Sequence, residues 1–158
     1  MRLKVISLSL SILLAGSLMA MLVGLGCAVL CYSKEEDELA YYTLKQLAEY
    51  MGVPMPMYGW DFPECRGTLG CFLKSLGYIG FTSGRYSYRV GAHEFGHYYW
   101  RQRHGYDIDE GPSEGYARAF EDLWMSQSFP CQVCGLQVLA GGRERVVCPR
   151  CGSEYARD

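Results

Sequence analysis

The chain has 158 residues, with 15 Lys and Arg against 17 Asp and Glu, so its formal net charge is −2. This length accommodates one compact domain with accessory segments and excludes a large multidomain enzyme. Because acidic and basic residues nearly balance, nothing in the overall charge attracts a phosphate backbone, and nucleic acid is not an expected partner.

The N-terminal region carries a long apolar run. No residue from 5 to 33 is charged, and this run exceeds the roughly 20 residues that a helix needs to cross a bilayer. We expect a single-pass membrane anchor that contacts lipid through residues 5–31. Arg2 and Lys4 precede the run and acidic residues follow it, which predicts a cytoplasmic N-terminus and a soluble part outside. A cleaved signal peptide is the alternative, but its apolar core usually has only about 7–15 residues.

A first soluble helix is predicted over residues 37–51. Its apolar positions recur at helical spacing, at Ala40, Leu44, Leu47 and Met51. Gly52 is placed to end the helix in a left-handed conformation. Residues 53–71 contain three prolines and several glycines, which predicts irregular structure with at most short strands.

A small antiparallel sheet is expected before the next helix. Residues 77–82 and 85–88 are rich in aromatic residues and flank the turn-forming pair Ser83 and Gly84. This arrangement is typical of a β-hairpin.

Two further helices follow in the sequence. The second is predicted from about Ser87 to Arg103, with Gly105 as its C-terminal cap. Gly91 and Gly96 lie inside it, and each costs about 1 kcal/mol relative to alanine, so close backbone packing is expected there.

The third helix is predicted from Ser113, as N-cap, to about Gln127. Its apolar stripe consists of Ala117, Phe120 and Trp124.

The segment His93-Glu94-Phe95-Gly96-His97 has the spacing HExxH. On a helix this spacing puts both imidazoles on one face, one turn apart, where they can bind one metal ion. Zinc is the expected ion, because it accepts imidazole nitrogen and leaves one position for water in a catalytic site. Glu94 is then placed to act as general base on that water. A chance coincidence on an ordinary amphipathic helix is the competing interpretation.

Three residues are candidates for the third protein ligand. Glu114 lies 17 residues beyond His97, at the start of the predicted third helix. Glu121 lies seven residues further on, on nearly the same helical face, and could instead orient a zinc-bound histidine. His104 is the remaining candidate. Ligand chemistry and helical facing favour Glu114.

Four cysteines near the C-terminus form two CxxC pairs separated by 13 residues, namely Cys131 with Cys134 and Cys148 with Cys151. This spacing predicts a structural zinc site with four thiolate ligands. A segment of about 30 residues cannot fold on a core of its own, whereas zinc binding can supply the missing free energy. Two disulfides are the alternative. Cys65 and Cys71 can form a disulfide if exported or stay reduced in the cytosol, and the sequence leaves both open.

The HExxH segment, followed by Glu114-Gly-Tyr-Ala-Arg-Ala-Phe120, resembles zincin metallopeptidases of the gluzincin type, including the compact ImmA/IrrE-like domains. The resemblance covers about residues 37–127. It implies a helix, a small sheet whose edge strand lays out the substrate, the metal-binding helix and a helix that carries Glu114 as third ligand. Family members commonly have an acidic residue after the alanine of the second motif, where this chain has Arg118.

A four-cysteine ribbon after an HExxH domain is also similar to SprT-like proteases. Their third ligand is a histidine at a longer spacing, which His104 does not reproduce.

These features predict an α+β chain in three parts: a transmembrane anchor over residues 1–36, a zincin-like metallopeptidase domain over residues 37–127 and a zinc ribbon over residues 128–158. The expected function is a membrane-anchored zinc endopeptidase with a peptide or protein substrate, one catalytic zinc ion and one structural zinc ion. The alternatives are a catalytically silent zincin scaffold whose ribbon binds protein or nucleic acid, and a virion or envelope structural protein.

Overall fold

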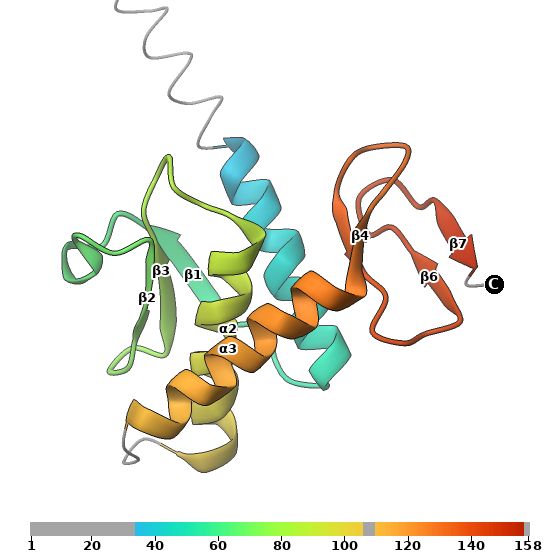
Figure 1. Cartoon of the computed structure of the whole chain (residues 1–158). Helices are drawn as coiled ribbons and strands as arrows, with labels where there is room; N and C mark the ends of the chain where they lie inside the picture. The colour runs from blue at the N-terminus through green and yellow to red at the C-terminus, as the bar shows by residue number, and fades with distance from the viewer. Residues whose placement is uncertain (1–33, 106–109, 157–158) are drawn as a thin grey trace, which may run out of the picture. The chain divides into compact units, whose positions relative to one another are not determined.

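The structure is a computed structural model that describes residues 34–105 and 110–156 (Figure 1). From Glu36 onward the chain forms one compact α+β unit, in which three helices pack with small sheets. The predicted membrane anchor lies outside the described residues. Within the described part, none of the helices is both long and apolar enough to span a bilayer.

An N-terminal helix covers residues 34–51 and ends at Gly52, which has a φ of 63°. Of its predicted apolar positions, Ala40, Leu44 and Leu47 are fully buried, and Met51 is partly buried against the same core. Its acidic first turn is partly buried too. Glu36 is only 5% exposed, and its carboxylate accepts hydrogen bonds from the backbone N–H groups of Gly84 and Tyr86, at 2.9 and 3.0 Å. This carboxylate therefore fixes the loop that leads into the next helix.

The main sheet has three short strands: β1 (Met57–Trp60), β2 (Gly70–Leu73) and β3 (Tyr78–Phe81). β3 lies in the centre, parallel to β1 and antiparallel to β2. The sheet is therefore mixed, and the prediction of a purely antiparallel sheet was wrong. Among the described strands β2 is an edge strand.

The predicted hairpin around Ser83 and Gly84 was also wrong. The observed hairpin joins β2 to β3 through residues 74–77. Residues 85–88 form no strand, because Glu36 binds the N–H group of Tyr86 and Ser87 caps the next helix.

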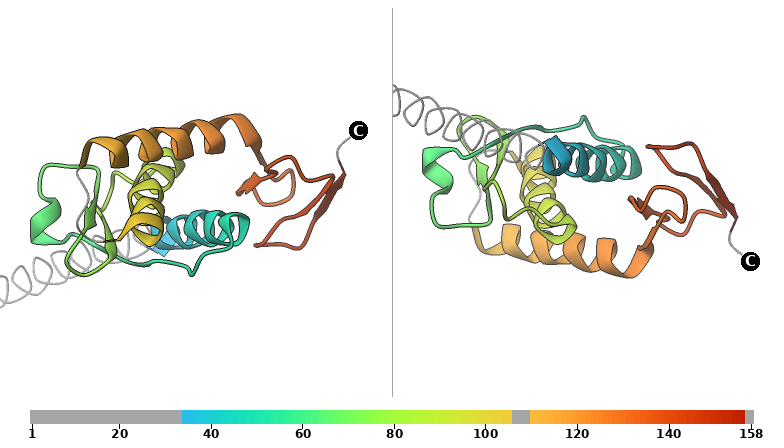
Figure 2. Two further views of the ribbon diagram at one scale, coloured as in Figure 1. Left: turned by 90° about the horizontal axis from the view of Figure 1, so that it is seen from below. Right: turned by 90° about the horizontal axis from the view of Figure 1, so that it is seen from above.

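Helix α2 (Tyr88–His104) carries the HExxH segment and has the predicted ends. The Ser87 side chain accepts a hydrogen bond from the N–H group of Val90, and Gly105 ends the helix with a φ of 83°. Figure 2 shows α2 lying between the N-terminal helix and helix α3 (Glu110–Gln127). Residues of all three helices, Leu44, Phe95 and Phe120 among them, form one apolar core with β3.

Helices α2 and α3 cross at Gly96, where the sequence predicted close backbone packing. A Cβ atom on Gly96 would lie 2.8 Å from the backbone N of Ala117 and 2.9 Å from the carbonyl oxygen of Tyr116. Only glycine at this position lets the backbone of α3 approach α2 so closely. Gly91 similarly leaves room for the side chains of Tyr86 and Thr43.

Helix α3 begins at Glu110, three residues before the predicted N-cap Ser113, and ends at Gln127 as predicted. Pro112 does not interrupt it, because backbone N–H groups in the first turn have no helical acceptor to lose. Ser113 is therefore a residue within the helix, and its side chain is available for another role.

The cysteine-rich segment contains two small antiparallel sheets. β4 (Ser128–Pro130), which follows α3 without a linker, pairs with β5 (Gln137–Leu139). β6 (Arg145–Val147) pairs with β7 (Glu154–Ala156). The predicted domain boundary at residue 128 stays a prediction.

The N-terminal helix anchors this segment through a buried amide. The Gln46 side chain accepts from the N–H group of Leu139 at 2.9 Å and donates to the carbonyl oxygen of Gln137 at 3.2 Å. Arg150 also forms an ion pair with Glu38, with an N–O distance of 3.0 Å.

Gly96→Ala should lower the free energy of unfolding by about 1–3 kcal/mol, because the added methyl group meets backbone atoms of α3 that cannot move independently. Gly115→Ala is the matched control, since nothing lies within 4 Å of a Cβ at that helical position. The control should be neutral or stabilising by up to about 1 kcal/mol. Urea unfolding followed by circular dichroism measures both, and equal stability of Gly96→Ala and the wild type would contradict the tight crossing.

Candidate metal centres

Two histidines on one face of α2 direct their rings toward a common point. The Nε2 atoms of His93 and His97 lie 3.2 Å apart. Each Nδ1 atom contacts α3 instead: that of His93 lies 2.5 Å from Oε1 of Glu121, and that of His97 lies 2.6 Å from Oγ of Ser113. With Nδ1 engaged in this way, each ring directs Nε2 toward the common point, where it could bind a metal.

Glu114 brings a carboxylate to the same point. Its Oε2 lies 3.8 Å from Nε2 of His93, and its Oε1 lies 3.5 Å from Nε2 of His97. In a tetrahedral zinc site with bonds of about 2.0–2.1 Å, neighbouring ligand atoms are about 3.3 Å apart. The three observed separations lie around this value. Two imidazoles and a carboxylate therefore fit a divalent metal such as zinc and can hold it with one side open.

The other two candidate ligands lie elsewhere. Both carboxylate oxygens of Glu121 are engaged away from Nε2, one by His93 Nδ1 and one by the guanidinium of Arg89. Burial alone would raise the pKa of Glu121, but these hydrogen bonds and charges outweigh it and keep the pKa below its usual value. Glu121 can therefore orient His93 as a charged partner. The His104 ring stacks on Trp100, with ring centroids 3.7 Å apart, and does not join the group.

Ser113 has a role that was not predicted from the sequence. The sequence indicated only a helix cap at this position, whereas the Ser113 hydroxyl contacts the Nδ1 atom of His97. The position of Ser113 directly before Glu114 could have indicated this contact. A residue next to a candidate ligand on a crossing helix can reach the ring of a neighbouring histidine.

Glu94 lies beside these three candidate ligands without belonging to their group. It is only 6% exposed. Burial raises its pKa to about 8, and the carboxylates of Glu114 and Glu121 add to the effect. A divalent cation close by would lower this pKa, because an adjacent positive charge favours the carboxylate.

Gly70 of β2 makes room for the Glu94 side chain. A Cβ atom at Gly70 would lie 2.9 Å from Cγ of Glu94, 3.1 Å from its Oε1, and 2.9 Å from Cγ1 of Val90. The first residue of the edge strand thus touches the buried carboxylate, which places β2 along the candidate metal site.

Two hollows meet at His93 and Glu94. One has a volume of about 440 Å³ and is bordered by residues 70–72 of β2, by Lys74 in the turn that follows the strand, and by Glu114 on α3. The other has a volume of about 480 Å³ and lies toward Leu69, Arg89 and Val90. The space beside the candidate metal site therefore extends to both sides of it.

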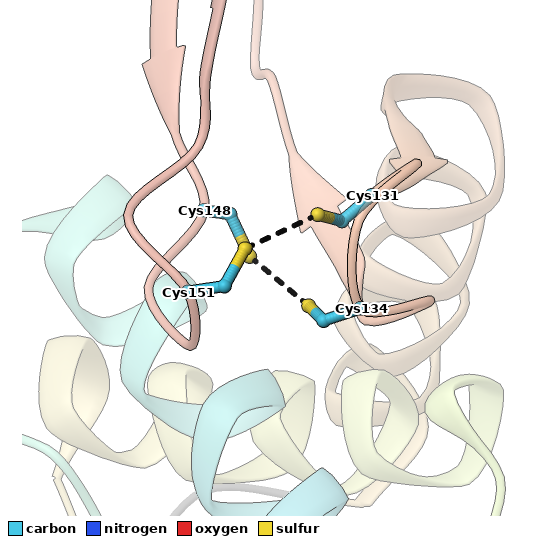
Figure 3. Close-up of side chains that lie close together, drawn as sticks. All are labelled: Cys131, Cys134, Cys148 and Cys151. Carbon is cyan, nitrogen blue, oxygen red and sulfur yellow. Dashed lines mark hydrogen bonds between the residues drawn. The ribbon is translucent and has the colours of Figure 1, made fainter.

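The four C-terminal cysteines form a second group that can hold a metal (Figure 3). Sγ of Cys131 lies 3.5 Å from Sγ of Cys151, and Sγ of Cys134 lies 3.6 Å from Sγ of Cys148. The four sulfurs are free thiols, not the two disulfides considered as an alternative. Tetrahedral zinc with bonds of about 2.3 Å to sulfur separates its ligand atoms by about 3.8 Å, so the spacing fits a four-thiolate zinc site.

Local backbone geometry builds both turns of this cluster. The N–H group of Gly135 donates to the carbonyl oxygen of Cys131 at 2.8 Å, and that of Gly152 donates to Cys148 at 2.9 Å. Both glycines have positive φ angles, of 74° and 76°. The Tyr155 hydroxyl donates to Cys131 Sγ at 3.0 Å and lowers the pKa of that thiol to about 5. The hydrogen bond therefore favours the thiolate form of Cys131, which is the form that binds metal.

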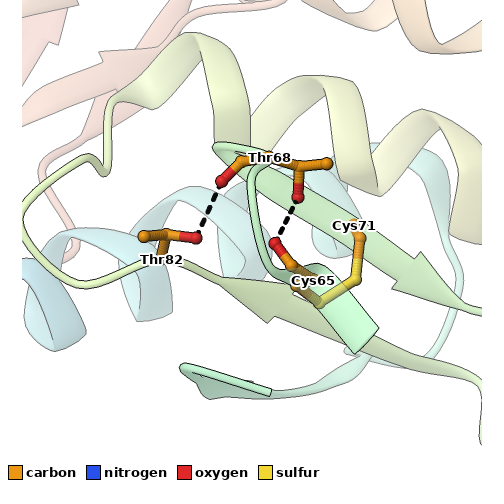
Figure 4. The surroundings of a disulfide bond; sticks show 4 residues. All are labelled: Cys65, Thr68, Cys71 and Thr82. Atoms are coloured by element: carbon orange, nitrogen blue, oxygen red, sulfur yellow. Dashed lines mark hydrogen bonds between the residues drawn. A yellow bond between two sulfur atoms is a disulfide. The ribbon is translucent and has the colours of Figure 1, made fainter. Parts of the chain in front are cut away.

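Cys65 and Cys71 form a disulfide, with their Cα atoms 5.5 Å apart (Figure 4). It joins the short helix η1 (Pro63–Cys65) to β2 on the face of the sheet where Gly80 leaves room for the Cys65 sulfur. Thr68 holds the intervening loop, since its hydroxyl donates to the carbonyl oxygen of Cys65 at 2.8 Å. The edge strand beside the candidate metal site is therefore cross-linked to the loop that precedes it.

Comparison with known proteins finds no match for this chain among family models, curated proteins or solved structures. Function is therefore inferred from the geometry of His93, His97 and Glu114 and from that of the four C-terminal cysteines.

Zinc-loaded full-length protein should contain two zinc ions per chain, one for each group. Glu114→Ala should lose most of one ion after dialysis against a weak chelator, because two imidazoles alone hold zinc less tightly than three ligands. Cys148→Ser should lose the other. Asp122→Ala removes an exposed carboxylate from the same helix as Glu114 and should retain both. Mass spectrometric metal analysis measures the content, and unchanged zinc in Glu114→Ala would exclude that residue as a ligand.

Proposed function

We propose that the chain is a membrane-anchored zinc endopeptidase in which His93, His97 and Glu114 hold the metal and Glu94 is the general base. One observation carries the proposal: three ligand residues converge beside a buried carboxylate that is not a ligand itself. Zinc bound there would activate a water molecule and polarise the carbonyl group of the peptide bond.

The role of Glu94 follows from its surroundings. Its carboxylate is shielded from bulk water and borders both hollows at the metal site. From this position it can take a proton from the attacking water and deliver it to the leaving nitrogen. Glu121 and Ser113 keep the two histidine rings in the required orientation during this transfer.

An extended peptide is the substrate that the edge of β2 suits best. The carbonyl oxygen of Leu69 accepts from the N–H group of Thr82, at 3.1 Å, so the backbone groups of Leu69 point toward β3. Successive residues in a strand alternate between its two edges, so Gly70 and Phe72 direct theirs toward the hollow beside the metal site. A peptide can add to such an edge by main-chain hydrogen bonds.

The hollows on both sides of His93 and Glu94 support cleavage within a chain. A peptide lying along β2 would continue past the metal in both directions. This favours an endopeptidase over an enzyme that removes single terminal residues.

The proposed location outside the membrane is supported by the disulfide between Cys65 and Cys71, because disulfides persist mainly in oxidising compartments. The four ribbon thiols would then depend on a bound zinc ion for protection from oxidation. An outward-facing soluble part is consistent with the basic residues that precede the apolar N-terminal run.

Glu94→Gln should reduce peptide hydrolysis by a factor on the order of 10²–10⁴, because glutamine cannot accept the proton of the attacking water. Its zinc content should stay at the wild-type level, since Glu94 is not a ligand. Glu64→Gln, an exposed residue in η1, serves as the control and should keep full activity. A mixture of quenched fluorescent peptides measures the rate.

Two results would contradict the proposal. Loss of zinc in Glu94→Gln would undermine the role given to this residue. A wild-type protein with both zinc ions that hydrolyses no peptide or protein would favour the silent scaffold with a binding ribbon.

Gly70→Ala should lower kcat by roughly 10–100-fold with little change in zinc content, because the new methyl group displaces the Glu94 carboxylate. Gly115→Ala again provides the control. If steady-state kinetics gave Gly70→Ala the wild-type kcat, Glu94 would not depend on the space that glycine leaves.

A further inference from the structure

One end of the disulfide between Cys65 and Cys71 lies in the edge strand that borders the candidate metal site. Gly70 and Phe72, the residues on either side of Cys71, both line the 440 Å³ hollow, and Gly70 also approaches the Glu94 side chain. Because side chains alternate along a strand, that of Cys71 leaves β2 on the face away from Glu94. The disulfide therefore fixes β2 from the face opposite to the site.

Cys65 is the tightly packed end of this disulfide. It belongs to η1 and is only 1% exposed. A Cβ atom on Gly80, in the central strand β3, would lie 2.3 Å from Sγ of Cys65 and 3.0 Å from the ring of Phe62. The Cys65 sulfur thus fills the notch that this glycine leaves, with Phe62 beside it. Cys71, in contrast, is only partly buried and belongs to an edge strand.

The bonding of the two sulfurs is therefore coupled to the position of β2. Two free thiols cannot lie as close together as two bonded sulfurs, and reduction also removes the covalent link. Because Cys65 is enclosed, most of the separation falls on Cys71 and on the strand that carries it. A shift of β2 would move Gly70 relative to Glu94 and displace the edge that we propose for the substrate.

This effect is local, because the rest of the loop has its own support. The hydroxyl of Thr68 donates to the carbonyl oxygen of Cys65, and that of Thr82 donates to the carbonyl oxygen of Thr68, each at 2.8 Å (Figure 4). The two cysteines are only six residues apart in sequence, and a disulfide stabilises the whole fold least when it closes a short loop. Reduction should therefore displace β2 without unfolding the chain.

A thiol reductant has access to this disulfide from the surface. Residues 66–69, which it encloses, are all exposed, and Cys71 is the more accessible of its two ends. An attacking thiolate bonds to Sγ of Cys71, and the electron pair of the broken S–S bond goes to Cys65, which takes up a proton. The second thiol of a dithiol reductant then displaces Cys71. The chain gains two electrons and two protons, and the reductant leaves as a disulfide.

We infer that Cys71 is a site of thiol–disulfide exchange that controls the proposed peptidase, which is active when oxidised and is switched off by a dithiol reductant. The inference depends on the proposed function and adds its regulation. Thiols stay reduced in the cytosol, whereas disulfides persist in exported proteins. The peptidase would then stay inactive until its soluble part has left the cytosol.

Hydrogen–deuterium exchange on the zinc-loaded full-length protein tests the movement of β2 directly. Reduction with a trialkylphosphine, which is itself oxidised to the phosphine oxide, should speed exchange of the amides in residues 66–73 at least about tenfold. Amides of α2 and of the four-cysteine segment should exchange as in the oxidised protein, and the zinc content should not change. Equal exchange of residues 66–73 in the two states would overturn the inference.

Cleavage of the quenched fluorescent peptides should fall roughly 10–100-fold on reduction and recover after reoxidation with oxidised glutathione. A double variant, Cys65→Ala with Cys71→Ala, should show no response to the reductant. It keeps the four free thiols at the C-terminal end, so it controls for their reaction. If the reductant inactivated this variant as strongly as the wild type, the effect would arise elsewhere and the inference would be wrong.

Peptide binding separates this inference from the proposed function. The zinc-loaded Glu94→Gln protein should bind fluorescently labelled members of the same peptide mixture at least about 3-fold more tightly when oxidised than when reduced. Redox-dependent exchange and binding without any cleavage would contradict only the proposed function. Equal binding, or equal cleavage, in the two states would overturn only the redox control.

Discussion

The candidate metal site depends on the close crossing of two helices. Gly96 lets the backbone of α3 at Ala117 lie directly against α2. Because the crossing occurs one residue before His97, the first half of α3 passes over both histidines. A longer interhelical distance would remove Glu114 from the metal position and separate the rings from their partners at the same time.

Helix α3 supplies polar partners to both histidines. Glu121 and Ser113 engage the Nδ1 atoms, while Glu114 approaches the Nε2 atoms from the same helix. A metal bound there would bridge α2 and α3, so its binding free energy would also stabilise their packing. A metal bound by the four cysteines would likewise stabilise the segment after α3, since β4 continues directly from that helix.

Local patterns predicted much of this arrangement. The HExxH spacing, the caps at Ser87 and Gly105, and the two CxxC turns depend on residues close together in sequence, and such features follow from helical period and turn chemistry. The partner of β3 could not be predicted in this way. Glu36, about fifty residues distant in sequence, binds the N–H group of Tyr86 and removes it from any hairpin. The contact of Ser113 with His97 likewise depends on how α3 crosses α2. The glycines in α2 predicted close packing there but did not identify the partner.

The burial of Glu36 has a consequence for any shortened form of the chain. This carboxylate lies only a few residues after the apolar N-terminal run, yet it holds the loop that leads into the HExxH helix. A truncation that starts at residue 34 keeps this support, whereas one that starts at residue 37 removes it. A fragment that keeps this contact with the loop before the HExxH helix must therefore begin upstream of Glu36.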